Sequence, residues 1–445
     1  MHTRRLPSGE RFSELVRLFL LGLPLPVAVA EAALGPSTLG HLERARWLEW
    51  CHGGVRARVK LVPHGDVLVA SDRDAGPSGA DWVAGIHPPS VTLAKLTVRH
   101  PVARALDVGT GNGIQALLAS RHAETVVATD VNPRALAFAS LNAQLNRVGN
   151  VELRQGNLFE PAGGEQFDLI TCNPPYVISP EARYAYRDSG LPGDAVSQQV
   201  VERTPECLDE GGFGHILVSW AHTPGDPWSP LERWVEGSGC DSWLLYFGSD
   251  DPVTHAGEWL KPVADKDLGR YRQALAAWLD YLERFGIEAI AHGAVILRRR
   301  SGGRNWTRKD QVELDRLEQA SEHVLRVFRS QDYLNALADE RALLDTSFTL
   351  VERHHLDQTL VCRDNETTLE GTALSLDEGL GFRVGLDLHT TRLLPLLDGR
   401  RPLRDVLAPQ AGEPALSADD SARFTTAALP VVRRLVELGF LVPTH

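Results

Sequence analysis

Apolar positions between residues 81 and 300 switch between two patterns, and the alternation predicts strands that take turns with helices. Short continuous apolar runs are typical of strands buried on both faces, and apolar residues three or four positions apart are typical of helices. The predicted strands cover 103–108, 125–129, 151–154, 167–172, 214–219, 243–247 and 289–297, and the predicted helices cover 113–120, 133–146 and 196–208. Such alternation indicates an α/β fold with a parallel sheet and right-handed crossovers. A polar loop and one helix at 249–285 interrupt it as an insertion.

The patterns on either side of this sheet predict two smaller domains. Residues 1–80 contain short helical patterns and then two strand-like runs, 55–62 and 67–70, around the turn 63–66. Residues 305–445 begin with a charged helical pattern at 308–337. They end with short helices at 391–397, 403–407 and 427–438, a glycine at 439 and a strand at 440–442. Both segments are winged-helix-like, so we expect three domains: 1–80, 81–300 and 305–445.

The composition is that of a water-soluble globular protein. Of the 445 residues, 43% are hydrophobic and 23% are charged, and the formal net charge is -12. That charge argues against a surface that grips nucleic acid through phosphate contacts alone. The five cysteines are scattered and form no metal-binding pattern, which favours reduced thiols, a cytoplasmic location and no metal site.

The N-terminal apolar run needs a separate interpretation. Residues 18–30 follow two arginines and resemble a secretory signal. Glu10 and Glu14 stand before the run and Pro24 and Pro26 break it, so we favour helices of the N-terminal domain. No run is long enough to cross a membrane, and we expect no membrane contact.

A glycine-rich turn follows the first predicted strand of the sheet. It reads Asp107-Val108-Gly109-Thr110-Gly111-Asn112-Gly113. Glycine permits positive φ and a close approach of the backbone to a ligand, and the next helix offers free N–H groups to an anion. Asp107 can balance a cationic group of that ligand. A dinucleotide-binding turn would need a third glycine at position 114, where Ile114 stands.

Two polar residues end the next strands. Asp130 lies 17 residues after Gly113, where an acidic residue of a nucleotide-binding fold accepts hydrogen bonds from ribose hydroxyls. It could instead cap the helix that starts at Pro133, but Asn132 is better placed for that role. Asn157 follows the third strand, where either adenine recognition or a simple turn is expected.

The segment Asn173-Pro174-Pro175-Tyr176 is the most specific signal in the chain. The Asn173 side-chain carbonyl and the Pro174 backbone carbonyl can accept the two N–H bonds of a planar NH2 group. Pro175 stiffens the turn, and Tyr176 can lie over a planar amide or base. These four residues are therefore expected to form the catalytic site. Holding an NH2 group in this way positions its nitrogen for an in-line displacement, which needs neither a metal nor a covalent nucleophile.

At these residues the chain resembles the class I S-adenosylmethionine-dependent methyltransferases, and most closely the HemK-type protein-glutamine N5-methyltransferases that act on release factors. The resemblance covers about residues 80–220. It implies a Rossmann-like sheet, mostly parallel with an antiparallel last strand. It also implies S-adenosyl-L-methionine as cofactor and a protein substrate. The cofactor-binding residues that it implies are Asp107, Gly109, Thr110, Gly111, Gly113, Asp130, Val131, Asn157, Leu158 and Asn173.

Departures from the family leave other substrates open. Asn157 stands where the family usually has Asp, and His87-Pro88-Pro89-Ser90 replaces a Pro-Arg-Pro-x-Thr stretch near the substrate entrance. The segment 186–194 is similar to the Gly/Asp-containing stretch that follows the family's Asn-Pro-Pro-Tyr. The same tetrapeptide also occurs in adenine-N6 and guanine-N2 methyltransferases of RNA and DNA, which hold a flipped base. A third possibility is a non-catalytic binding module, which the intact motif residues disfavour.

Overall fold

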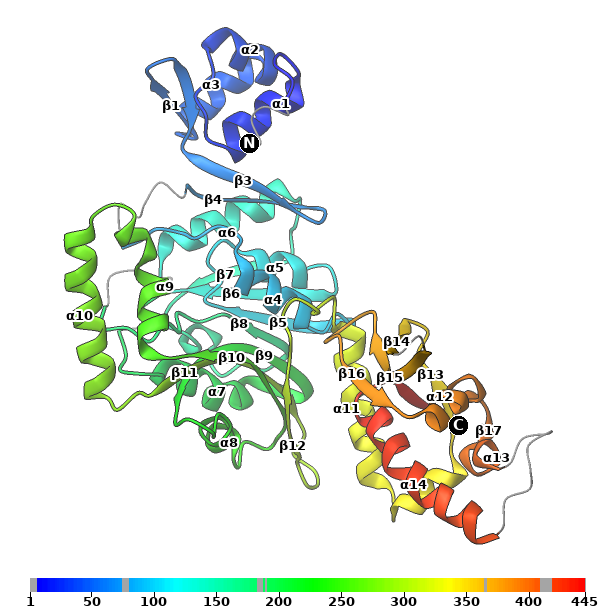
Figure 1. Ribbon diagram of the computed structural model, residues 1–445. Helices are drawn as coiled ribbons and strands as arrows, with labels where there is room; N and C mark the ends of the chain where they lie inside the picture. The colour runs from blue at the N-terminus through cyan, green and yellow to red at the C-terminus, as the bar shows by residue number, and fades with distance from the viewer. Residues whose placement is uncertain are drawn as a thin grey trace. The chain divides into compact units, whose positions relative to one another are not determined.

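The computed structural model describes residues 6–73, 80–181, 187–188, 190–363, 366–408 and 418–444 (Figure 1). The chain forms two compact units, one made of residues 1–94 and 101–311 and the other of residues 95–100 and 312–445. Within the described residues, no helix has both the length and the apolar character needed to span a membrane.

An eight-stranded sheet forms the centre of the first unit. Its strand order is β12-β10-β11-β9-β8-β5-β6-β7. The strands are β5 (Val102–Val108), β6 (Ala123–Asp130), β7 (Val151–Gln155), β8 (Phe167–Cys172), β9 (Leu208–His222), β10 (Cys240–Asp250), β11 (Ala289–Arg299) and β12 (Thr307–Gln311). Only β11 runs antiparallel to its neighbours, β9 and β10, and the other pairs are parallel. The predicted mostly parallel α/β sheet is confirmed. The strand predicted as the antiparallel last one is β11, but β12 follows it and is parallel to β10.

Helices connect these strands and cover the sheet (Figure 1). They are α4 (Pro88–Leu96), α5 (Ile114–Ala119), α6 (Pro133–Leu145), α7 (Ala195–Arg203) and α8 (Ser229–Val235), with the 3₁₀ turns η3 (Glu160–Ala162) and η4 (Thr204–Cys207). The helix predicted at 196–208 ends earlier, at Arg203, because Pro205 has no N–H group with which to continue the α-helical hydrogen bonds. Side chains such as Leu106, Ile170 and Val295 are almost fully buried, and each contributes about 1.5–3 kcal/mol of hydrophobic stabilisation.

Strand β12 was predicted as part of a helix at 308–337, and that prediction was wrong for its first residues. Residues 307–311 pair with β10 in parallel, and the helix α11 begins only at Ser321. Two of the charged residues of β12, Arg308 and Asp310, contact Trp243 of the neighbouring strand β10. The Arg308 guanidinium lies 5.0 Å from the centre of the Trp243 ring, and Asp310 accepts a hydrogen bond from the Trp243 indole nitrogen at 2.9 Å. Because charged residues are typical of an exposed helix, the sequence pattern did not reveal this edge strand.

The insertion is a helical hairpin rather than a polar loop with one helix. It consists of α9 (Pro252–Ala264) and α10 (Leu268–Arg284), which run side by side (Figure 1). Asp251 and Asp267 cap the two helices by accepting backbone N–H groups. Pro262 within α9 concealed this helix from the pattern. The hairpin buries Leu260 and Trp278 against Val177, which lies just after the Asn-Pro-Pro-Tyr segment.

The N-terminal segment also differs in detail from the prediction. It contains α1 (Arg11–Leu15), the π-helical turn η2 (Val16–Leu20), α2 (Val27–Leu34) and α3 (Pro36–Arg44), followed by β1 (Leu48–Cys51), β2 (Gly54–Ala57), β3 (Val59–His64) and β4 (Val67–Asp72). The hairpin around 63–66 is present as β3 and β4. Residues 55–57, however, belong to a second hairpin in which β2 pairs with β1. Leu18, Leu25 and Ala30 of the apolar run pack into this segment's core.

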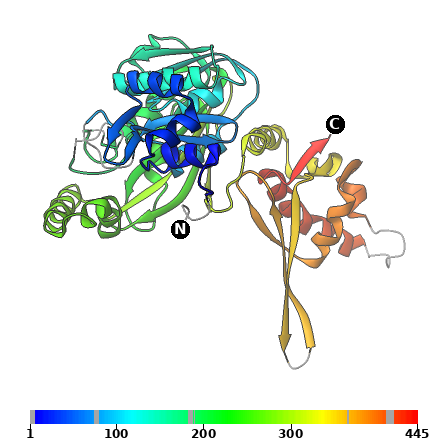
Figure 2. The ribbon, with the colours of Figure 1, turned by 90° about the horizontal axis from the view of Figure 1, so that it is seen from above.

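The second unit contains more strands than the sequence predicted. Its helical elements are α11 (Ser321–Ala336), η5 (Glu340–Asp345), α12 (Leu388–Leu393), η6 (Leu394–Leu396), α13 (Leu403–Leu407) and α14 (Ala418–Glu437). Its strands are β13 (Ser347–Leu350), β14 (His354–Arg363), β15 (Glu366–Leu376), β16 (Arg383–Leu386), β17 (Asp398–Pro402) and β18 (Leu441–Thr444). Strands β14 and β15 form a long projecting hairpin (Figure 2). Gly439 follows α14 with φ of 74°, as expected for a helix end. The winged-helix-like character of both flanking segments stays a prediction.

Candidate active site

A pocket of about 170 Å³ lies at the carboxyl ends of β5, β6 and β8. This is the edge where open α/β sheets bind their ligands. Ten of the predicted site residues line it: Asp107, Gly109, Thr110, Gly111, Asp130, Val131, Asn157, Leu158, Asn173 and Pro175. Gly113, Pro174 and Tyr176 were also predicted but are not part of the lining. The pocket therefore joins the glycine turn, the two strand-end residues and the Asn-Pro-Pro segment.

The glycine turn leaves its backbone open to the pocket. Gly109 and Gly111 have φ of 69° and 55°, which glycine adopts without strain. A Cβ atom at either residue would meet no protein atom within 4 Å. The space is therefore free for a ligand to approach the backbone.

Gly113 has a different role from the one predicted. Its φ is 85°, and a Cβ atom there would lie 3.0 Å from the Cα of Ala139 in α6. Gly113 thus allows the start of α5 to pack closely on α6, and it does not face the pocket. The spacing of the motif could not separate a packing glycine from two ligand-facing glycines.

These two kinds of glycine should respond differently to alanine. Gly113→Ala is expected to lower the free energy of unfolding by about 2–4 kcal/mol, since it adds a steric overlap to the backbone strain. Gly109→Ala adds the strain alone and is expected to cost about 1 kcal/mol. Urea unfolding of both variants measures the difference. Equal losses would contradict the assigned packing role of Gly113.

Asp107 is buried, and all its contacts are internal. The register of β5 and β8 places it beside Thr171, whose hydroxyl donates to Oδ1 at 3.0 Å. Oδ2 accepts the Thr110 hydroxyl at 2.6 Å and the Ala116 N–H at 3.2 Å. Burial raises the pKa of Asp107 to about 6, while these hydrogen bonds act in the opposite direction. The carboxylate is thus held rigidly at the pocket and is charged at neutral pH.

Asp130 organises the backbone on the other side of the turn. Its Oδ2 accepts the Gly111 N–H at 2.9 Å, and its Oδ1 accepts the Asn132 N–H at 2.8 Å. Burial raises the pKa of Asp130 above its ordinary value. The predicted capping role falls to Asn132, whose side chain accepts the Arg134 N–H at the start of α6. Each Asp130 oxygen keeps a lone pair for a ligand hydroxyl.

The opposite wall of the pocket is partly apolar. Val131 is 57% exposed at the pocket, and Leu158 has φ of 46°, which is uncommon for a residue with a side chain. Asn157 has the turn role considered for it, and its role in adenine recognition stays a prediction. Its carbonyl accepts the Glu160 N–H at 3.0 Å and so begins the turn η3, and the residue also lines the pocket. Val131 and Leu158 offer apolar surface to a flat ring.

Asn173 follows β8 directly and lies at the wall of the pocket. Within the described part of the chain, no hydrogen bond involves its half-buried side chain. The Pro174 carbonyl was predicted to be free. It instead accepts the Tyr176 N–H at 2.8 Å. This short turn is a consequence of the stiff Pro-Pro sequence, and it leaves the carbonyl one lone pair. Burial raises the pKa of the Tyr176 phenol, which therefore stays protonated.

The loop after Tyr176 is fixed by a buried charge network. Residues 182–186 and 189 lie outside the described residues, so the predicted stretch 186–194 is seen only in part. Arg187 is 8% exposed, and its Nε contacts Asp188 Oδ1 at 2.6 Å. The same guanidinium pairs with Glu181 and lies 5.7 Å from the centre of the Trp278 ring of α10. The inserted hairpin therefore contacts residues that follow the Asn-Pro-Pro-Tyr segment.

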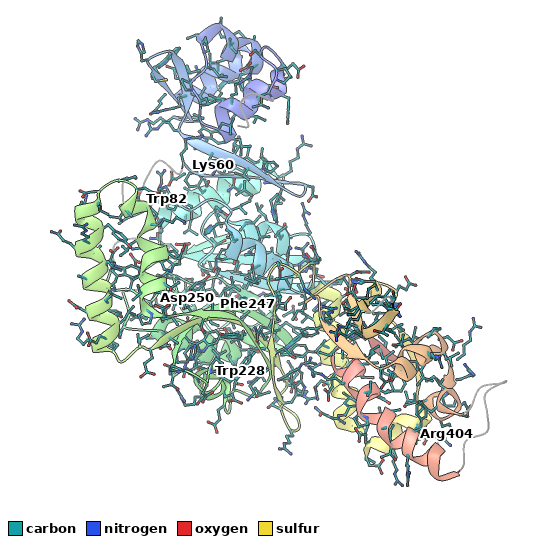
Figure 3. The ribbon with its side chains drawn as sticks, in the orientation of Figure 1. Lys60, Trp82, Trp228, Phe247, Asp250 and Arg404 are labelled. Atoms are coloured by element: carbon teal, nitrogen blue, oxygen red, sulfur yellow. The ribbon has the colours of Figure 1, made fainter. Side chains whose placement is uncertain are left out.

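A segment before β5 also lines the pocket. The resemblance placed its residues 87–90 near the substrate entrance, but nothing in the sequence indicated residues 82–84. Trp82, which Figure 3 labels, lines the pocket together with Val83, Ala84, His87 and Ser90. Three side-chain amides hold this segment. Asn132 donates to the Asp81 carbonyl at 2.9 Å, Asn112 to the Ala84 carbonyl at 2.9 Å and Gln115 to the Ser90 carbonyl at 2.8 Å. Buried side-chain amides need hydrogen-bond partners. Polar residues at and just after the glycine turn, such as Asn112 and Gln115, were therefore the signal that another segment packs here.

Comparison with known proteins agrees with this geometry. The family model for the methyltransferase small domain matches residues 89–226, and two models described only as domains of unknown function match residues 2–58 and 325–443. A release factor glutamine methyltransferase of Geobacter sulfurreducens is 36% identical over 184 residues, which are 37% of this chain and 63% of that protein. The chain thus spans less than two thirds of that relative.

Two further relatives carry related names. A Methanocaldococcus jannaschii protein, provisionally named a protein N5-glutamine methyltransferase, is 33% identical over 29% of this chain and 68% of its own length. A ribosomal protein uL3 glutamine methyltransferase of Bradyrhizobium diazoefficiens is 36% identical over 26% of this chain and 41% of its own length. Among solved structures, Trm5b from Pyrococcus abyssi aligns with a TM-score of 0.34 and 17% identity, covering 54% of this chain and 56% of that chain.

Proposed function

Because this chain belongs to the S-adenosylmethionine-dependent methyltransferases with a small methyltransferase domain, we propose that it methylates the side-chain amide nitrogen of a glutamine in a protein. The names of the relatives support the glutamine acceptor. The observation that carries the proposal is the Asn173 side chain, which lines the pocket and has no hydrogen-bond partner among the described residues.

The pocket residues fit S-adenosylmethionine. Gly109 and Gly111 leave space beside the backbone that a Cβ atom would fill. Asp130 keeps acceptor capacity for ribose hydroxyls, and Val131 and Leu158 would pack on the adenine ring. Asp107 would balance positive charge on the cofactor. When bound, the cofactor supplies an electrophilic methyl group.

The acceptor nitrogen would be held by the Asn-Pro segment. The Asn173 side-chain oxygen would accept one N–H of the glutamine amide, and the remaining lone pair of the Pro174 carbonyl would accept the other. Two fixed acceptors orient the nitrogen and reduce the entropy lost on reaching the transition state. They also stabilise the positive charge that develops on the nitrogen. The rigid turn of Pro174 and Tyr176 contributes by keeping these acceptors in place.

Cofactor affinity should depend on pH through Asp107. As the pH falls below about 6 the carboxylate gains a proton, and a cationic cofactor loses its partner. The dissociation constant is therefore expected to be flat near pH 7.5 and to rise by up to about tenfold per pH unit below the pKa. Asp130, whose pKa is also raised by burial, would act in the same direction. Asp107→Asn should remove the Asp107 part of the dependence. Calorimetric titration at several pH values measures this, and an unchanged wild-type constant down to about pH 5 would contradict it.

The proposal is tested by incubating the purified protein with methyl-labelled S-adenosylmethionine and a cell lysate. The labelled fraction is then divided and treated with protease or with nuclease. We expect a label that protease releases, and hydrolysis should yield N5-methylglutamine. Asn173→Ala serves as the control. A label that survives protease and is released by nuclease would instead support the alternative, methylation of a nucleic-acid base.

A further inference from the structure

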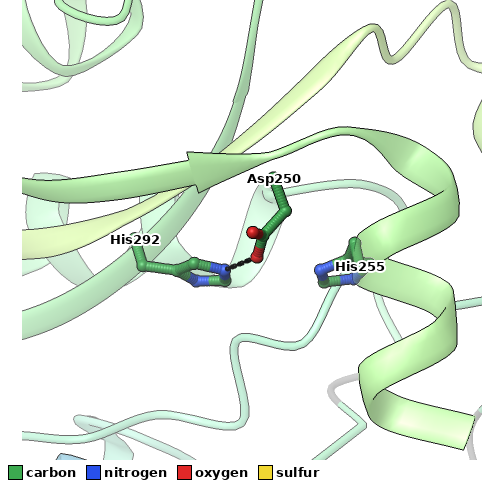
Figure 4. A group of neighbouring side chains, drawn as sticks. All are labelled: Asp250, His255 and His292. Carbon is green, nitrogen blue, oxygen red and sulfur yellow. Dashed lines mark ion pairs between the residues drawn. The ribbon is translucent and has the colours of Figure 1, made fainter.

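Three potential metal ligands meet beside the inserted hairpin. They are Asp250 at the end of β10, His255 in the first turns of α9 and His292 in β11 (Figure 4). One nitrogen or oxygen atom from each lies within 4.8 Å of the others. None of the three lines the pocket described above.

The hydrogen bond of His255 fixes which of its nitrogens is available. Its Nε2 lies 3.0 Å from the Ile178 carbonyl oxygen, which can only accept, so Nε2 carries the proton. Nδ1 is then left with a lone pair. That atom is buried and has no hydrogen-bond partner among the described residues, and the whole residue is 1% exposed. A buried unpartnered acceptor is uncommon and calls for an explanation.

The other two side chains lie beside the His255 ring. His292 Nε2 lies 3.4 Å from Asp250 Oδ2, and the His292 ring stacks on the His255 ring with centres 6.1 Å apart. The His292 and Asp250 side chains are 33% and 39% exposed, so an ion can reach them from solvent.

We propose that His255 Nδ1, His292 Nε2 and the Asp250 carboxylate bind a divalent transition metal of the zinc class. Imidazole nitrogen and carboxylate oxygen are ligands of Zn²⁺, whereas Mg²⁺ and Ca²⁺ prefer oxygen alone. Tetrahedral zinc sites place such ligand atoms about 3.4 Å apart, close to the 3.4 Å between His292 and Asp250. The Nε2–H bond of His255 to a backbone carbonyl is the outer contact that orients most histidine ligands. Three protein ligands leave one position for water.

The site would join three elements to the loop that continues from the catalytic segment. Ile178, whose carbonyl orients His255, lies two residues after Tyr176. The preceding Val177 packs on Ala256 and Leu260 of α9. A bound ion would hold α9 against β10 and β11 and so stabilise the support of this loop. Metal binding itself does not depend on the proposed methyl transfer.

The test is a metal titration of the full-length protein after dialysis against a chelator. Zn²⁺ is titrated in competition with a chromophoric chelator, and Co²⁺ is titrated while its visible absorption is recorded. We expect one ion per chain and the intense Co²⁺ bands of a four-coordinate site. His292→Asn should weaken Zn²⁺ binding by about 100-fold or more, and Asp250→Asn by about tenfold or more.

A matched control is available in the second unit. His355 also lies beside two carboxylates, Asp357 and Asp377, but its side chain is 49% exposed. His355→Gln is expected to leave the Zn²⁺ affinity unchanged. Circular dichroism of each metal-free variant checks its folding, and Asp250, at a partly exposed strand end, provides a variant with little effect on packing. A wild-type protein that binds no stoichiometric Zn²⁺, or variants that bind it as tightly as wild type, would overturn the proposal. Because the readout is metal affinity, its failure is distinct from a failure of glutamine methylation.

Discussion

Replacing Asn173 by alanine is expected to lower kcat for methyl transfer by about 10²- to 10³-fold, while the dissociation constant of S-adenosylmethionine changes by less than about twofold. The Asn173 side chain lines the pocket and has no hydrogen-bond partner among the described residues. Its removal therefore breaks no hydrogen bond among those residues. What is lost is one acceptor for the substrate NH2 group. Steady-state kinetics and calorimetric titration with the cofactor measure the two quantities.

A second asparagine in the same pocket provides the control. Asn157 also lines the pocket, but it lies after β7, on the cofactor side. Asn157→Ala should weaken cofactor binding and leave kcat at saturating cofactor nearly unchanged. Parallel losses of kcat and cofactor affinity in Asn173→Ala would count against its assigned role in holding the acceptor.

Replacing Asp130 by alanine is expected to raise the dissociation constant of S-adenosylmethionine by about 10- to 100-fold. The substitution removes the acceptor that we propose for the ribose hydroxyls. It also releases the N–H groups of Gly111 and Asn132, which Asp130 holds at 2.9 and 2.8 Å. At saturating cofactor, kcat should fall much less, because the acceptor side of the site is untouched. Calorimetric titration measures the affinity, and kinetics at high cofactor concentration measure kcat.

Asp168 allows the effect of the fold to be separated from the effect of the ligand. Like Asp130, it accepts a backbone N–H, that of Arg104 at 2.8 Å, but it does not line the pocket. Asp168→Ala should lower the thermal midpoint without changing the cofactor affinity. If Asp130→Ala bound the cofactor as tightly as wild type, the ribose assignment would be lost.

The central sheet was readable from the sequence where its strands are buried on both faces. The run 167–172 was predicted with the same bounds as β8. A strand that is buried on both faces forms a continuous apolar run, because neither face needs polar residues. The edge strand β7 was also predicted, at 151–154, but the other edge strand and the long hairpin of the second unit were not. The charged residues of β12 resembled a helix, and β14, whose side chains are largely exposed, went unpredicted.

The site was predictable to the extent that its contacts are local in the sequence. Asp130 ends a strand, and the glycine turn and Asn173 each come at the end of another, so a shared sheet edge brings them together. The contacts of Gly113 with Ala139 and of Gln115 with Ser90 depend on how separate elements pack. Neither could be read from spacing.

The proposed metal ligands show the same limit more strongly. Asp250 and His255 are five residues apart, but His292 follows only after the whole of α10. It joins them because β10 and β11 pair in a register that places Gly248 opposite His292. The prediction of a loop and a single helix between these strands gave no reason to group the three side chains.

The most direct test of the account is a crystal structure with S-adenosylhomocysteine and a glutamine-containing peptide of a methylated substrate. We expect the Asn173 side-chain oxygen to lie about 2.7–3.2 Å from the glutamine amide nitrogen, with that nitrogen facing the cofactor sulfur. A complex in which the Asn173 side chain points away from the bound amide, or in which another group holds the acceptor nitrogen, would contradict the account.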